Sequence, residues 1–127
     1  MIAARVLVVE DSVLNAGLLG DMLMAMGHAV CATEASEAGA IAAAARCRPD
    51  LVIVDIQLGR GSGIRAIAEI MRNGFVPHVF VSGDLSELSG PRAGVAMLRK
   101  PFRMAQLDQA IQHVLLPQRH ALPILPG

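Results

Sequence analysis

The sequence has few aromatic residues. Three of its 127 residues are phenylalanine, and it contains neither tryptophan nor tyrosine. A flavin-binding electron carrier usually holds the flavin ring between aromatic side chains, which this chain scarcely offers. The chain also lacks an excess of one charge, because 11 Lys and Arg balance 11 Asp and Glu. Nucleic-acid-binding domains usually carry a basic excess, so we expect no DNA binding by this chain.

Long apolar runs are missing too, although 54% of the residues are hydrophobic and only 17% are charged. No run approaches the roughly 20 apolar residues that span a bilayer, and the N-terminus lacks the pattern of a signal peptide. We therefore expect a cytoplasmic protein without membrane association. The composition is too apolar for a disordered chain, and the length suits one domain with one hydrophobic core.

Cysteine is scarce. Cys31 and Cys47 are the two cysteines, and they form neither a CxxC motif nor part of a histidine cluster. We interpret them as reduced and mostly buried thiols, the usual state of free cysteine in such a protein. A disulfide or a metal site is the alternative.

Short apolar runs alternate with helical patterns along the chain. Three of these runs are continuously apolar rather than alternating, which is typical of strands covered on both faces in a parallel sheet. The expected strands are Val6–Val9, Ala29–Thr33, Leu51–Val54, Val79–Val81 and Val95–Leu98.

The segments between these runs predict helices. After Ser12, a stripe of Leu14, Leu18, Met22 and Met26 is expected to face the core, with Leu19 and Leu23 beside it, and Gly27 ends the helix. Further helices are predicted at about 36–46, from about 62, and at about 104–115. Between the fourth and fifth strands, Ser89-Gly90-Pro91 would break a helix almost at once, so only one or two turns are expected there.

This alternation predicts a single α/β domain: a doubly wound parallel sheet of five strands with a short or degenerate fourth helix. The domain would occupy residues 1–116. Residues 117–127 contain three prolines and no periodicity, so they are expected to form an extended or disordered tail.

Polar residues follow four of the predicted strands at the point where each strand ends. They are Glu10 and Asp11, Asp55, Ser82 and Lys100. Because function in such sheets sits at the carboxyl ends of the strands, all five are expected to face one crevice. Clustered carboxylates repel each other, so a cation must offset them. Lys100 is one candidate, and Mg²⁺, which takes one or two carboxylates with waters and phosphate oxygens, is the other.

Four motifs in order resemble the receiver domain of two-component response regulators. They are VLVVEDS, LVIVDIQLGRGSG, VFVSGD and MLRKPF, and the resemblance runs from Val6 to about Leu116. It implies a flavodoxin-like strand order 2-1-3-4-5. It also implies a phosphorylation switch that receives its phosphoryl group from a histidine kinase or histidine phosphotransfer protein and signals to a downstream protein.

The resemblance also implies a role for each site residue. Asp55 would accept the phosphoryl group, Lys100 would pair with it, and the Ser82 hydroxyl would close onto it. Asp11, Asp55 and the backbone carbonyl of Gln57 would bind Mg²⁺, and Glu10 would do so through water. Such transfer needs mostly positioning and charge neutralisation.

The chain departs from the family pattern in three places. Met97 stands where the family usually has an aromatic residue, Gly59 stands where it usually has proline, and the stretch from Ser82 to Lys100 is short. These departures leave phosphoryl acceptance intact. They predict that the signal leaves through the loop after Ser82 rather than through an aromatic side chain.

An enzyme is the competing class. Haloacid-dehalogenase-like phosphatases also use a strand-end Asp, a Lys and Mg²⁺. They usually place a second Asp two residues after the nucleophile as general acid, and here Gln57 holds that position. The chain also lacks an insertion that would recognise a substrate.

Overall fold

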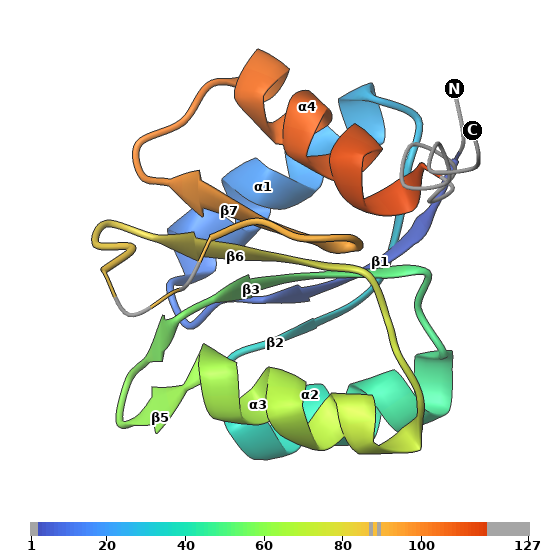
Figure 1. Cartoon of the computed structure of the whole chain (residues 1–127), viewed down its shortest axis with the longest axis vertical. Helices are drawn as coiled ribbons and strands as arrows, with labels where there is room; N and C mark the ends of the chain where they lie inside the picture. The colour runs from blue at the N-terminus through green and yellow to red at the C-terminus, as the bar shows by residue number, and fades with distance from the viewer. Residues whose placement is uncertain (1–2, 87, 89, 117–127) are drawn as a thin grey trace, which may run out of the picture.

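The computed structural model of the chain describes residues 3–86, 88 and 90–116. Its main sheet has five parallel strands in the order β2-β1-β3-β6-β7, which confirms the predicted sheet and its order. Helices α1 and α4 cover one face of the sheet, and α2 and α3 cover the other (Figure 1). The strands are β1 (Arg5–Val9), β2 (Ala29–Glu34), β3 (Leu51–Asp55), β6 (His78–Ser82) and β7 (Val95–Arg99), and the helices are α1 (Val13–Ala25), α2 (Glu37–Cys47), α3 (Gly63–Ile70), the short 3₁₀ helix η1 (Met71–Asn73) and α4 (Met104–Leu115).

The strands are continuously apolar because both of their faces are covered. In β1, Val6 and Val8 pack beneath α1 and α4, whereas Leu7 and Val9 pack toward α2 and α3. All four side chains are almost fully excluded from solvent. Alternate residues of one strand thus enter two separate hydrophobic layers, as a doubly wound sheet requires.

Serine residues begin three of the helices. The hydroxyl oxygens of Ser12, Ser36 and Ser62 accept hydrogen bonds from backbone N–H groups in the first turns of α1, α2 and α3. These bonds satisfy N–H groups that have no partner within the helix. All three helix starts therefore lie where the sequence predicts them.

The core-facing stripe predicted for α1 is wrong in part. Leu19 and Leu23 are buried, but Leu14 is 72% and Leu18 is 54% exposed, while Met22 and Met26 are partly buried. Residues four apart drift by about 40° around a helix at each step, so the ends of a long i, i+4 series lie on different faces. The sheet selects the face carrying Leu19 and Leu23.

The segment between β6 and β7 contains no helix among its described residues, 83–86, 88 and 90–94. A turn remains where that helix was expected, in which the Leu88 N–H donates to the Leu85 carbonyl at 3.0 Å, and a separate turn at Arg92–Val95 leads into β7. The predicted fourth helix is thus reduced to a single turn. A short antiparallel hairpin of β4 (Gln57–Leu58) and β5 (Gly61–Ser62), which the sequence did not predict, follows β3.

The predicted tail, residues 117–127, lies outside the described part of the chain. Within the described part, no helix combines the length and the apolar character that a membrane span requires.

Candidate functional site

The carboxyl ends of the central strands bring the predicted acidic residues together. Glu10 and Asp11 follow β1, and Asp55 is the last residue of β3, which lies beside β1. One carboxylate oxygen from each of the three lies within 4.8 Å of those of the others. Glu10 and Asp55 are each only 7% exposed, whereas Asp11 is exposed. An all-oxygen cluster that opens to solvent on one side suits a hard divalent cation.

Lys100 provides the positive charge within this cluster. Its Nζ lies 2.6 Å from Asp55 Oδ2 and 3.2 Å from Glu10 Oε1. Its backbone N–H donates to the Ser82 carbonyl at 2.9 Å, so β6 fixes the position at which the side chain begins. Burial alone would lower the pKa of Lys100, but the carboxylates of Asp55 and Glu10 outweigh it and the pKa is raised. Lys100 is therefore held as a cation.

Glu10 ionises less readily than an ordinary glutamate. Burial is the largest cause of its raised pKa, and the negative charge of Asp55 adds to it. The backbone N–H of Ser12, which donates to Glu10 Oε2 at 3.0 Å, and the charge of Lys100 oppose the rise. Three carboxyl groups thus lie around the Lys100 ammonium, and burial makes Glu10 the one whose pKa is raised.

Ser82 and Gln57 lie at the edges of the cluster. Asp55 pairs in register with Val81, so Ser82 is one residue further along the neighbouring strand. The Ser82 hydroxyl is buried and accepts a hydrogen bond from the Asp84 N–H at 3.1 Å. The Gln57 backbone N–H donates to Asp55 Oδ1 at 3.0 Å. This bond places the Gln57 backbone beside the carboxylate, while the Gln57 side chain is exposed.

Comparison with known proteins decides the family. The family model for the response regulator receiver domain matches residues 6–112. The chain belongs to this family. A phosphoacceptor signalling role fits this family.

Similar proteins include receiver domains within longer chains. The transcriptional regulatory protein PdtaR of Mycobacterium tuberculosis is 34% identical over 112 residues, which cover 85% of this chain and 55% of PdtaR. A protein-glutamate methylesterase of Anaeromyxobacter dehalogenans is 34% identical over 110 residues, 83% of this chain and 32% of that enzyme. The receiver domain thus spans about half of PdtaR and a third of the methylesterase.

Among solved structures, the receiver domain of Erythrobacter litoralis PhyR superposes with a TM-score of 0.79 at 32% identity. The match covers 89% of this chain and 90% of that one. The PhyR structure therefore matches this receiver domain over nearly its whole length.

Two features that hold the loop after Asp55 in place were not predicted. A Cβ atom at Gly63 would overlap the Asp55 backbone carbonyl, so only glycine lets α3 begin this close to β3. Glu37, at the start of α2, accepts hydrogen bonds from the Ser62 N–H and from the Arg65 side chain. Glycine and serine in the loop were visible in the sequence, but the long-range contact with Glu37 was not.

A cavity of about 400 Å³ adjoins the site of the receiver domain. Asp55 and Lys100 line its polar end, and its apolar walls include Leu18, Met22 and Phe102. Nearby on α1, Val13 is 89% exposed and Leu14 is 72% exposed. The sequence pattern missed this apolar surface because it placed Leu14 and Leu18 in the core.

Proposed function

We propose that this receiver domain accepts a phosphoryl group on Asp55. The observation that carries the proposal is the Asp55 carboxylate, which lies at a strand end between a fixed Lys100 ammonium and two further acids. In the reaction, an Asp55 oxygen attacks the phosphorus of a phosphohistidine. The nitrogen–phosphorus bond breaks, and the imidazole leaves with its electron pair. The protein's contribution is position and charge, as is general for phosphoryl transfer.

Lys100 and Ser82 would act on the transferred group. After transfer, the Lys100 ammonium would pair with a phosphoryl oxygen in place of the Asp55 oxygen that it contacts in the structure. The Ser82 hydroxyl, which accepts a hydrogen bond from Asp84, can itself donate to a phosphoryl oxygen. This donation would draw the loop after Ser82 toward Asp55.

The acidic cluster fits Mg²⁺. Asp11, Asp55 and the backbone carbonyl of Gln57 would hold the ion, and Glu10 would act through water. The donor set is all oxygen, and its three carboxyl groups face the ammonium of Lys100. When bound, the ion supplies neutralisation of charge on phosphoryl oxygens.

The phosphoryl donor would be a histidine kinase or a histidine phosphotransfer protein that docks on the apolar surface of α1. Val13, Leu14 and Leu18 are the exposed side chains of this surface, and Leu18 also lines the cavity that Asp55 lines. A donor protein has to approach the exposed side of the acidic cluster, and exposed apolar side chains there supply the contact area.

The phosphorylated form would signal through the loop between β6 and β7. Its described residues form turns rather than a helix, and its Leu85 and Leu88, like Met97 of β7, are only partly buried. Few buried contacts imply low local stability, so a pull on Ser82 can rearrange this loop. A downstream protein would bind the loop together with β7 and α4.

Acceptance by Asp55 is tested with Mg²⁺ and acetyl phosphate. Intact mass should show one added phosphoryl group on the wild type and on the control Asp108→Asn, whose carboxylate lies on α4. Asp55→Asn should show none. A label of equal yield on Asp55→Asn would overturn the assignment.

Docking on α1 is tested with two kinds of donor. Leu14→Asp should slow transfer from a phosphorylated histidine phosphotransfer protein at least tenfold and leave labelling by acetyl phosphate unchanged. Met24→Asp, at an exposed position near the C-terminal end of α1 and outside the lining of the cavity, is the control. Equal slowing by both variants, or none by Leu14→Asp, would place the donor elsewhere.

A further inference from the structure

The two cysteines lie next to each other at the outer edge of the sheet. Cys31 is in β2, the edge strand, and its side chain packs against the hydrophobic layer beneath α2. Cys47 is the last residue of α2, and its Sγ lies 3.6 Å from the Cys31 carbonyl oxygen. Both thiols are free and only partly buried, because an edge strand and a helix end leave them accessible to solvent. The prediction that Cys31 and Cys47 are mostly buried is therefore wrong in degree, because both are only partly buried.

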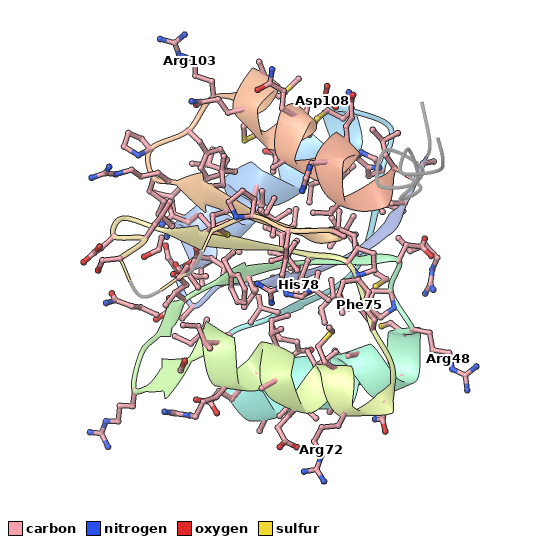
Figure 2. The ribbon with its side chains drawn as sticks, viewed as in Figure 1. Arg48, Arg72, Phe75, His78, Arg103 and Asp108 are labelled. Carbon is pink, nitrogen blue, oxygen red and sulfur yellow. The ribbon has the colours of Figure 1, made fainter. Side chains whose placement is uncertain are left out.

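The surroundings of this pair contain a positive charge. Burial and the neighbouring Cys47 thiol raise the pKa of Cys31, and the Arg5 guanidinium opposes part of that rise. Arg5 is held in place because it donates to the carbonyl oxygens of Cys47 at 2.6 Å and Arg48 at 3.2 Å. Arg48 itself points away from the sheet at the end of α2 (Figure 2). Among the described residues, no group of three or more metal-binding side chains includes either cysteine, which argues against a metal site.

We propose that Cys31 and Cys47 are a thiol pair that forms a reversible intramolecular disulfide, joining the C-terminal end of α2 to β2. The pair is 16 positions apart in sequence but adjacent in space. Disulfides within proteins of reducing compartments are usually transient and redox-sensing. The site is separate from the acidic cluster, since Glu37, which holds the loop after Asp55, lies at the opposite end of α2.

The oxidant would be a low-molecular-weight disulfide such as glutathione disulfide. Cys31 packs against the hydrophobic layer beneath α2, whereas Cys47 lies at the end of that helix, so the first attack is assigned to Cys47. The Cys47 thiolate attacks one glutathione sulfur and releases glutathione thiolate. Cys31 then loses its proton and attacks the Cys47 sulfur of the mixed disulfide, which releases the second glutathione. The protein loses two electrons and two protons, and the oxidant becomes two thiols.

The test uses the full chain, reduced and then equilibrated in glutathione buffers of increasing oxidation. Samples are quenched in acid, alkylated with N-ethylmaleimide and weighed intact. We expect the wild type to lose both alkylation sites together, without bound glutathione, and to yield a linked peptide containing Cys31 and Cys47. Cys31→Ser should retain one glutathione on Cys47. The oxidised wild type should melt several degrees above the reduced form, while the Cys31→Ser, Cys47→Ser double variant should show no such difference.

The alternative outcomes are distinct. Two bound glutathiones per chain, a linkage between two chains, or two alkylatable thiols in the most oxidising buffer would each overturn the proposal. Labelling of Asp55 by acetyl phosphate should be the same in both redox states. A failure of phosphorylation is therefore distinguishable from a failure of disulfide formation.

Discussion

Replacing Lys100 with methionine tests the electrostatics of the acidic cluster. The substitution keeps an unbranched apolar chain and removes the ammonium that lies 2.6 Å from Asp55 and 3.2 Å from Glu10. It leaves two nearly buried carboxylates without their cation. Methionine offers the polarizable bulk of a long side chain, so the loss is mainly one of charge.

The expected loss of stability follows from the burial of the three groups. Removing one partner of a fully buried pair costs about 3–5 kcal/mol, whereas exposed pairs contribute about 0–1 kcal/mol. The two carboxylates are buried, but the Lys100 side chain is 30% exposed, so solvent screening places the cost near 2 kcal/mol. For a domain of this size, that corresponds to a fall of about 8 °C in the thermal midpoint.

The assay is urea and thermal unfolding followed by circular dichroism, in EDTA and in millimolar Mg²⁺. Lys100→Met should lose about 2 kcal/mol in EDTA and gain more from Mg²⁺ than the wild type, because the cation no longer competes with an ammonium. Adding Asp55→Asn to Lys100→Met should recover part of the loss, since the remaining repulsion falls. Arg99→Met, which changes the exposed neighbouring residue, is the control. Equal losses for Arg99→Met and Lys100→Met, or strict additivity with Asp55→Asn, would refute this account of the cluster.

Two further predictions concern Glu10 and Gly63. Burial and the charge of Asp55 raise the pKa of Glu10 in the folded protein, so ionisation of Glu10 lowers the free energy of unfolding. This loss is absent at pH values below the unfolded pKa near 4.5, and it grows as the pH rises toward the folded pKa. In EDTA, Glu10→Gln should therefore gain stability relative to the wild type as pH rises through that window, and a flat difference in urea midpoints would contradict this. Gly63→Ala should lower the free energy of unfolding in urea by about 2 kcal/mol or more, because the added Cβ overlaps the Asp55 carbonyl. The control Gly17→Ala, at an open helical position, should raise it by about 0.5–1 kcal/mol. Equal effects of the two substitutions would show that the overlap is relieved without cost.

The sheet and the acidic cluster could be predicted because both depend on local signals. Continuous apolar runs mark strands that are covered on two faces, and parallel strands bring their ends to one edge. Glu10, Asp55 and Lys100 each follow such a run directly, so their proximity is a consequence of topology. Contacts between distant segments leave no such signal. The hydrogen bonds that Glu37 accepts from the Ser62 N–H and the Arg65 side chain depend on how α2 lies beside α3, which no spacing in the sequence records.

Helix α1 shows why an apolar surface is harder to predict than an apolar core. Its sequence is apolar on nearly every face, so periodicity could not separate Leu14 and Leu18, which are exposed, from Leu19 and Leu23, which are buried. A helix that only had to cover the sheet would need one apolar face, with polar residues opposite. Leu14 and Leu18 lie outside the buried core cluster, and Leu18 lines the cavity that Asp55 also lines. The leucines that the simple pattern placed in the core thus belong to the surface on which we propose that a phosphoryl donor docks, and their substitution tests that role.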